Sequence, residues 1–361
     1  MSIASQLSIE DILELAIEYK ASDIHLKANM PPVFRIDGLI RSVPDLPVLD
    51  PESLRHMIFG FLTPRQQQMF EENFELDCAL LFGDAARVRV NVYLDIDSVG
   101  AAMRIVPIEI PSVEELGLPP VIDKLTREKQ GLILVTGVTG AGKSTTLASM
   151  INSVNARDAS HIYTMEDPIE FVHRPKCSII TQREIGFTTK SFSNALKAAL
   201  RADPDVLLVG EMRDPTTIQM ALRAAETGHL VLSTLHTPSA PKTIQRILGA
   251  FDPGVQETIR LQLASALKAV IAQQLVPMMG GGRICVQEIM ICTNSIQDAI
   301  LKGEIDSLTE FIKASAYDGM QTMDGALYNA YREGLIDGDT AKQYALNPGE
   351  MDRILRGAMT R

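Results

Sequence analysis

The stretch GLILVTGVTGAGKST, residues 131–145, decides the fold that we expect for this chain. Leu132 to Thr136 are mostly aliphatic and β-prone, which predicts a buried parallel strand. The pattern GxxxxGK[ST] follows from Gly137 to Ser144 and is typical of a loop whose N–H groups surround phosphate oxygens. Because Lys143 to Ile151 has a helical pattern, the phosphates would lie at a helix N-terminus, where unpaired amides favour anions. Nucleotide binding is therefore predicted.

Length, charge and cysteine content limit the class of protein. A chain of 361 residues is long for a single core, so two domains are expected. The net charge of −11 argues against a broad nucleic-acid surface, and we expect no nucleic-acid partner. The four cysteines include no CxxC pair, which indicates neither a disulfide framework nor a zinc site and favours the cytoplasm.

Neither a signal peptide nor a membrane-spanning segment is expected. The N-terminal residues include acidic Glu10 and Asp11 and lack a basic and apolar leader. The most apolar long stretch, Leu261 to Met279, is interrupted by Lys268 and Pro277 among other residues. We therefore expect a cytoplasmic protein that is at most peripheral to a membrane.

Residues 1–108 are expected to form a small α+β domain with antiparallel strands. Ser8 and Asp11 form a capping-box pattern, which predicts a helix start. The residues that this helix is expected to bury are Ile9, Ile12, Leu13, Ala16 and Ile17.

Three further patterns in this region predict strands. Val33 to Val43 is a hairpin around Asp37-Gly38, and Arg87 to Tyr93 is an amphipathic strand whose partner is Val99 to Val106. The proline-rich stretch 109–118 is expected to be a linker.

Strands and helices alternate after the linker, which predicts a parallel α/β core over 119–292. The remaining elements expected in it are strands at His161–Met165, Val206–Val209 and Leu230–Leu235 and helices near 191–201 and 215–227. From about Ser239 the chain is expected to be mainly helical, with one strand near Ile284–Met290. Residues 293–361 would form a helical C-terminal subdomain.

An NTPase needs carboxylates near the phosphates, and two segments supply them. Glu211 follows the aliphatic strand PDVLLVG, a position that suits a Walker B role. Glu166, Asp167 and Glu170 lie in MEDPIEF, after another strand. Several carboxylates beside one phosphate site favour a Mg²⁺ ion among them, although each alone could be a solvated loop acid.

Two histidines, His229 and His236, stand on either side of the strand Leu230–Leu235. Their spacing of seven places them at opposite ends and on opposite faces. Phosphate sensing, contact with a neighbouring subunit, and structural or capping roles all remain open. Arg213 and Arg223 could pair with acids or reach phosphate.

Four motifs in order give a family resemblance. They are GVTGAGKST (Gly137–Thr145), MEDPIEF (Met165–Phe171), DPDVLLVGEMRD (Asp203–Asp214) and AETGHLVLSTLHT (Ala225–Thr237). The chain resembles the type IV pilus retraction ATPases of the secretion ATPase superfamily. The resemblance extends to Ala21–Gly38 and to Gly319–Leu327, and so covers nearly the whole chain.

The resemblance implies a homo-hexameric motor that hydrolyses ATP with Mg²⁺ to power pilus retraction and twitching motility. It implies a PAS-like N-terminal domain, a RecA-like core, and a place at the pilus base on the inner membrane. An inner-membrane platform protein is the implied partner, and a paralogous pilus ATPase is a further candidate.

Motif matching also implies roles for individual residues. Glu170 would be the general base, beside Glu166, and Ser144 and Glu211 would hold the metal. His229 and His236 would form the histidine box. The implied nucleotide-binding residues are Gly137, Thr139, Gly140, Ala141, Gly142, Lys143, Ser144, Thr145, Arg87, Arg89 and Arg104.

The chain departs from the family pattern in three places. Val138 and Ala141 replace the usual Pro and Ser of Walker A, where backbone amides do the binding. Asp95 and Asp97 replace polar or basic residues, which puts that nucleotide contact in doubt. The retraction-linked C-terminal motif reads SIQDAILKGE (Ser295–Glu304), and the tail is similar to the accessory retraction paralogue.

Other functions remain as alternatives. An assembly or type II secretion ATPase would usually have a longer N-terminal region and a four-cysteine zinc module. A nucleic-acid translocase would need a basic or aromatic-rich binding segment. A non-enzymatic scaffold is disfavoured by the intact lysine and acids.

Overall fold

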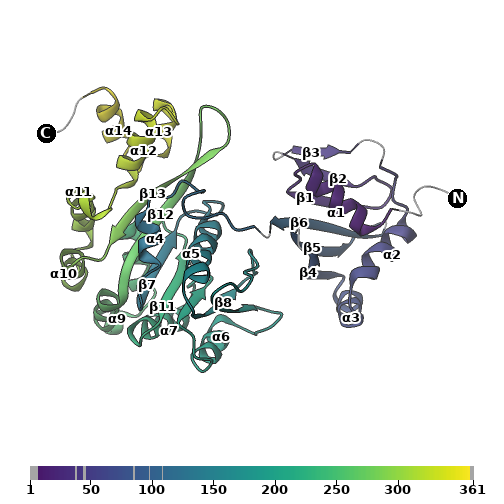
Figure 1. Ribbon diagram of the computed structural model, residues 1–361, viewed down its shortest axis with the longest axis horizontal. Coiled ribbons are helices and arrows are strands. Elements are labelled where there is room, and N and C mark those ends of the chain that lie inside the picture. The colour runs from purple at the N-terminus through teal and green to yellow at the C-terminus, as the bar shows by residue number, and fades with distance from the viewer. Residues whose placement is uncertain are drawn as a thin grey trace. The chain divides into compact units, whose positions relative to one another are not determined.

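The computed structural model describes residues 7–36, 39–43, 46–83, 86–96, 98–107 and 109–357. The chain forms two compact units, Met1–Glu109 and Ile110–Arg361. Each is described by itself (Figure 1).

The first unit contains a six-stranded antiparallel sheet in the order β3-β2-β1-β6-β5-β4. This agrees with the antiparallel α+β arrangement expected from its sequence. Its elements are α1 (Ile9–Glu18), β1 (Asp23–Leu26), β2 (Val33–Ile36), β3 (Leu39–Ser42), α2 (Pro51–Phe61), α3 (Pro64–Asn73), β4 (Glu75–Phe82), β5 (Ala86–Leu94) and β6 (Val99–Pro107).

The predicted capping box of α1 is confirmed. The Asp11 N–H donates to Ser8 Oγ at 3.1 Å, and the Ser8 N–H donates to Asp11 Oδ2 at 2.9 Å. The expectation for Ile17 is wrong, because its side chain is 36% exposed. It lies about 100° around the helix from buried Ala16, at the edge of the apolar stripe. The other four predicted residues are buried.

The strand predictions for this unit agree with the structure. β2 and β3 pair up to Ile36 and Leu39, but the predicted turn residues Asp37 and Gly38 lie outside the described residues. β5 and β6 pair along their whole length. Helices α2 and α3 were not predicted, although the caps Asp50-Pro51 and Thr63-Pro64 mark their starts.

The second unit contains a seven-stranded sheet in the order β13-β12-β7-β11-β10-β8-β9, parallel except for the pair β12–β13. Its strands are β7 (Gly131–Thr136), β8 (His161–Glu166), β9 (Ile179–Glu184), β10 (Val206–Val209), β11 (Leu230–Leu235), β12 (Leu267–Pro277) and β13 (Arg283–Ile291). Its helices are α4 (Val121–Leu125), α5 (Lys143–Arg157), α6 (Phe192–Ala199), α7 (Pro215–Glu226), α8 (Ala240–Leu248), α9 (Pro253–Ala266), α10 (Asn294–Lys302), α11 (Leu308–Ala314), α12 (Met323–Arg332), α13 (Gly338–Tyr344) and α14 (Pro348–Leu355), with 3₁₀ turns at Ile305–Ser307 and Ala316–Asp318.

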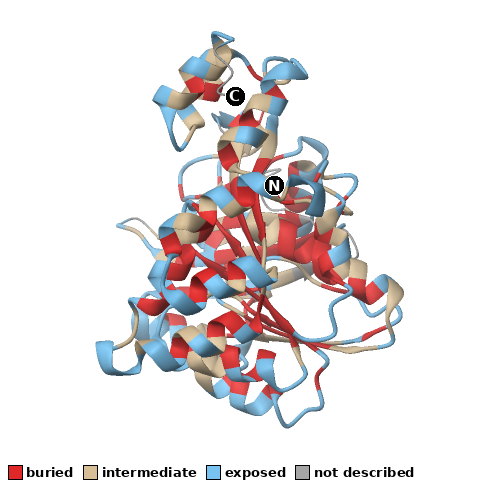
Figure 2. Cartoon of the chain, turned by 90° about the vertical axis from the view of Figure 1, so that its left-hand side faces the viewer, coloured by how far each residue is buried: buried red, intermediate tan, exposed pale blue. Residues whose placement is uncertain are grey.

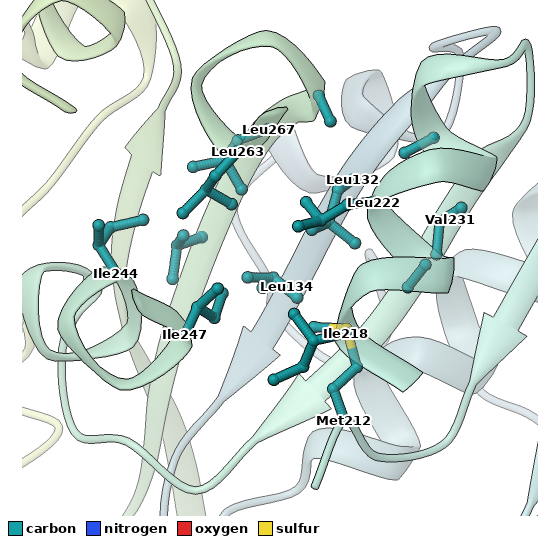
Figure 3. Packing of buried hydrophobic residues seen from close by; sticks show 14 of the residues in the cluster. Leu132, Leu134, Met212, Ile218, Leu222, Val231, Ile244, Ile247, Leu263 and Leu267 are labelled. Carbon is teal, nitrogen blue, oxygen red and sulfur yellow. The ribbon is translucent and has the colours of Figure 1, made fainter. Parts of the chain in front are cut away.

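Helices cover both faces of this sheet, so its central strands β7, β10 and β11 are buried on two sides (Figure 2). In β7, Leu132 and Leu134 pack on one face with α7 and α9, as Figure 3 shows. Ile133 and Val135 pack on the other face with α4 and α5. Because side chains alternate along a strand, a strand covered on both faces is a continuous apolar run.

The expectation of helix after Ser239 is wrong for β12. This eleven-residue strand pairs with β7 on one side and with β13 on the other. A buried apolar run has the same composition in a helix and in a two-sided strand, so its neighbours decide the outcome. The edge strand β9 was not predicted, whereas the strands predicted at β8, β10, β11 and β13 are present.

The C-terminal helices pack in two different places. α10 and α11 contribute Ile296, Ile300 and Leu308 to the main core. α12 to α14 form a separate small cluster with Val276 of β12 and Val286 of β13. The segment 109–118 that was expected to be a linker contributes Val113 and Leu118 to the core around α4.

No helix in the described ranges combines the length and the apolar character needed to cross a membrane.

Candidate functional site

The P-loop forms a glycine-rich turn between β7 and α5. Its tip, residues 138–140, is exposed, whereas Ala141 is buried. Gly137 has a φ of 141°, and a Cβ at this position would lie 2.3 Å from the backbone oxygen of Gln273. Glycine is therefore required both by the backbone conformation and by the close approach of β12.

The N-terminus of α5 is suited to bind an anion. Its N-cap, Gly142, has a left-handed φ of 86°, makes no side-chain cap, and is followed by a first turn without acidic residues. The N–H groups of Lys143, Ser144 and Thr145 are thus not capped by a side chain, and the helix dipole favours negative charge there. This arrangement fits phosphate groups.

Lys143 lies over the same turn. Its Nζ donates to the backbone oxygens of Gly137 at 2.8 Å and Val138 at 3.1 Å. It also lies 3.5 Å from Nδ1 of His236, the residue that follows β11. The lysine therefore connects the P-loop to the next strand of the sheet.

Glu211, which follows β10, extends this cluster. Its Oε2 accepts a hydrogen bond from Arg213 Nε at 2.7 Å, and its Oε1 lies 3.5 Å from His236 Nε2. Burial lowers the pKa of the Lys143 ammonium, whereas the carboxylates of Glu211 and Glu170 raise it. Ammonium, imidazole and carboxylate thus meet where three neighbouring parallel strands end, the usual place for a site in an α/β sheet.

Glu166 orders the MEDPIEF loop. Its Oε1 accepts hydrogen bonds from Thr164 Oγ1 at 2.7 Å and Gln182 Nε2 at 3.3 Å, and its Oε2 accepts one from the Glu170 N–H at 3.4 Å. The Asp167–Pro168 bond in the loop is cis. Glu166 therefore supports the segment that carries Glu170.

The donor set near the P-loop is compatible with magnesium. The described part of the chain has no cluster of three or more His, Cys, Asp or Glu side chains placed to hold a metal. Magnesium usually keeps several waters and binds one or two protein groups together with substrate phosphates. Ser144, in the first turn of α5, and Glu211 fit that sparse pattern, and their role stays a prediction.

His229 lies away from this cluster, at the opposite end of β11. Its backbone oxygen accepts a hydrogen bond from the N–H of Gly131, the first residue of β7, at 3.0 Å. Its Nδ1 lies 2.9 Å from the backbone oxygen of Ala224. Within one chain, the two predicted histidines therefore lie at opposite ends of the central strand β11.

The three predicted nucleotide-binding arginines lie on β5 and β6 of the first unit. Arg89 and Arg104 are paired across these strands, and Arg87 is buried. Arg104 Nε donates to Asp23 Oδ1 at 2.8 Å. Contact between these arginines and a nucleotide stays a prediction.

Of the two acids that depart from the family pattern, the structure describes Asp95. Asp95 forms an ion pair with Lys27 at 2.7 Å, which directs its charge to a cation of its own unit. Asp97 lies outside the described residues.

Sequence reasoning missed the polar side chains that support the site. Gln182 on β9 donates to the Phe171 backbone oxygen at 2.9 Å and to Glu166. Gln273 on β12 contacts the P-loop. Both strands escaped prediction, so no expected sheet edge was available on which to place these amides.

The chain is similar to proteins of one family along most of its length. The family described as "Type II/IV secretion system protein" matches residues 2–324. The "Type IV pilus retractation ATPase PilT" of Pseudomonas aeruginosa is 42% identical over 342 residues, covering 95% of this chain and 99% of that protein. The "Type IV pilus ATPase PilU" of the same organism is 38% identical over 351 residues, covering 97% and 92%.

A solved structure gives the same result for the fold. The structure titled "Crystal Structure of the Pilus Retraction Motor PilT and Bound ADP" has a TM-score of 0.91 and 45% identity, covering 96% of this chain and all of that one. The fold class expected from the motifs, with a RecA-like ATPase core, is confirmed by this similarity.

Proposed function

The chain belongs to the family of type II/IV secretion system proteins and, within it, to the type IV pilus retraction ATPases, and from this we propose that it hydrolyses ATP to power pilus retraction. One observation carries the proposal. Lys143, His236 and Glu211 meet beside the uncapped N-terminus of α5, which brings together a cation and a carboxylate of the kinds that phosphoryl transfer uses.

The P-loop residues bind the nucleotide phosphates in this proposal. The N–H groups at the start of α5 and the Lys143 ammonium neutralise phosphate charge, and Ser144 and Glu211 hold the magnesium ion. Magnesium supplies further charge stabilisation of the transferred phosphoryl group. Because these donors are fixed before the substrate binds, they need little reorganisation during the reaction.

Glu170 is the proposed general base. Its carboxylate is close enough to affect the pKa of Lys143, and its backbone N–H is held by Glu166. A base at this position would accept the proton of the attacking water. His236 orients Glu211, to which Arg213 also donates.

A homo-hexamer at the cytoplasmic side of the inner membrane is the proposed working form. Its partner would be the pilus platform protein, and the ring would convert ATP turnover into removal of pilus subunits. The support is the similarity to a pilus retraction motor over nearly the whole chain. Contact with a neighbouring subunit, one of the roles open to His229, would occur in the same assembly.

An accessory retraction ATPase is a second candidate. It is favoured by the similarity to PilU and by the altered motif SIQDAILKGE. In the structure this motif forms α10, where Ile296 and Ile300 are buried and Gln297 Nε2 donates to the Ala264 backbone oxygen at 2.8 Å. These three side chains hold α10 against α9 and the core.

Lys143→Ala tests the proposed activity. The change removes the ammonium from the phosphate site, and we expect the rate of ATP hydrolysis to fall by about a hundredfold or more. Release of phosphate by the purified protein is the measurement. Lys129→Ala, an exposed lysine near the other end of β7, is the control and should hydrolyse ATP like the parent. Equal turnover in Lys143→Ala would contradict the proposed site.

Pilus dynamics separate the two candidates. In a strain that lacks this gene, or that carries Lys143→Ala, a primary retraction motor leaves labelled filaments that extend but do not shorten. Shortening that continues at reduced force or frequency would favour the accessory candidate. Loss of all filaments would contradict both and indicate an assembly ATPase.

A further inference from the structure

The strand β12 places an uncharged side chain beneath the P-loop. β12 is parallel to β7, with Ala272 opposite Thr136, so the next residue, Gln273, lies beside the first residue of the loop, Gly137. The Gln273 side chain is 1% exposed. A buried amide is costly unless its hydrogen bonds are formed, so its partners indicate its purpose.

Both ends of the Gln273 amide bind the nucleotide-binding segment. Nε2 donates to the backbone oxygen of Ala141 at 2.7 Å, and Oε1 accepts from Thr146 Oγ1 at 3.0 Å. Ala141 lies in the loop, before the N-cap of α5, and Thr146 lies in the first turns of the helix. One side chain from another strand thus joins the two parts of the phosphate-binding turn.

The bond to Ala141 also fixes the direction of a donor. In a trans peptide, the C=O and the following N–H point in opposite directions. Because the Ala141 carbonyl points to Gln273, the N–H of Gly142 points away from β12. The N–H groups of a P-loop are the donors that surround phosphate oxygens.

We propose that Gln273 is a positioning residue for the nucleotide, because it holds the Ala141–Gly142 peptide in the orientation that presents the Gly142 N–H to phosphate. This inference rests on the nucleotide site proposed above. Gln273 acts through the loop backbone and through Thr146. Its loss should therefore weaken nucleotide binding more than it slows the chemical step.

The test is Gln273→Met, which keeps the approximate length of the side chain and removes both hydrogen bonds without adding charge. We expect the Kd of a fluorescent ADP analogue to rise roughly tenfold. The KM for ATP should rise in parallel, while kcat at saturating ATP changes by less than about threefold. The Kd, the KM and the kcat should all be measured in the full-length protein.

Gln274→Met is the matched control. Gln274 is the next residue on the strand. Its Nε2 donates to the backbone oxygen of Tyr344 in α13 at 3.4 Å, so this hydrogen bond joins β12 to the C-terminal helices and does not involve the P-loop. The control should bind the ADP analogue like the parent. The two variants should also unfold at similar temperatures without nucleotide, which separates positioning from a general loss of stability.

An unchanged Kd in folded Gln273→Met overturns the inference. Gln273→Asn is a second variant in case the first does not fold: it keeps the amide but is one methylene too short to reach both partners, and an unchanged Kd there has the same meaning. Failure of the parent itself to bind the ADP analogue would instead reject the nucleotide site, so the two failures are distinguishable.

Discussion

The strand β7 that carries the P-loop has two neighbours, and they supply different chemistry. On the β11 side, His236 and Glu211 bring ionisable groups, and His236 is 44% exposed. On the β12 side, Gln273 brings a neutral amide that is 1% exposed. One side presents charge to the space proposed for the phosphates, and the other holds the backbone of the loop from within.

This difference follows from the cost of burying charge. A carboxylate or ammonium beneath the loop would lose its hydration with little return, whereas an amide with two hydrogen-bond partners is accommodated. Charged groups therefore lie where they can face solvent and substrate. We therefore expect the β11 side to control turnover and the β12 side to control affinity.

Glu211→Gln should have the largest effect on turnover. The change preserves shape and removes the negative charge proposed to hold the metal, so kcat should fall by about a hundredfold. The Kd of the ADP analogue should change little, which is the reverse of the pattern expected for Gln273→Met. Steady-state kinetics and equilibrium titration measure both quantities. A large rise in Kd with an unchanged kcat would show that the two sides do not divide the work.

Acid sensitivity gives a second, smaller effect, from the segment between β8 and β9. Burial lowers the pKa of His173 to about 4, and nearby Lys176 acts in the same direction. Between pH 6.5 and 4 the unfolded chain binds a proton at this histidine and the folded chain does not, so stability falls as the pH falls, by up to about 3 kcal/mol.

His173→Gln should remove that contribution. Urea unfolding from pH 7 down to pH 4 should show a shallower loss of free energy of unfolding than in the parent. The exposed His56 gives the control His56→Gln, whose pH dependence should follow the parent. Equal slopes in His173→Gln and the parent would mean that the buried histidine does not stay neutral.

A buried acid on the β12 side should show the opposite and smallest pH effect. Burial raises the pKa of Glu288 on β13, with Asp324 adding to the shift, and hydrogen bonds from the N–H groups of Ala240 and Met323 oppose it. The folded chain therefore keeps a proton at Glu288 to higher pH than the unfolded chain. Stability from this group is present at low pH and declines as pH rises above the ordinary glutamate pKa.

Glu288→Gln isolates this contribution. As the pH rises from 4, the free energy of unfolding of the variant should increase relative to that of the parent. The exposed Glu114 supplies the control Glu114→Gln, which should show no such trend. A difference that stays constant with pH would indicate that the pKa of Glu288 is the same in the folded and the unfolded chain.

The sequence was sufficient to predict which strands and side chains lie on the β11 side of the P-loop. The pattern from Gly137 to Ser144 requires a particular backbone. His236 directly follows one short, bounded aliphatic strand, and Glu211 follows another after Gly210. Such runs leave little choice of structure. Their carboxyl ends then meet at one edge because parallel strands share a direction.

The β12 side could not be predicted in the same way. The run from Leu267 to Val276 is mainly apolar, with interruptions at Lys268, Gln273 and Gln274, and its pairing with β7 and β13 makes it a strand. Gln273 then looked like a polar interruption of an apolar stretch. Its role depends on contacts with Ala141 and Thr146, which are distant in sequence and follow no spacing rule.

The order of strands also affects how the protein is made. β7 is the first strand of the second unit to leave the ribosome, yet both of its neighbours, β11 and β12, are synthesised much later. Its edges have no native partner until then, because non-local pairing must wait for the partner strands. A nascent chain therefore has its complete P-loop sequence long before the loop has its support. The hydrogen bonds of Gln273 to Ala141 and Thr146 can therefore form only late in translation, once β12 has emerged.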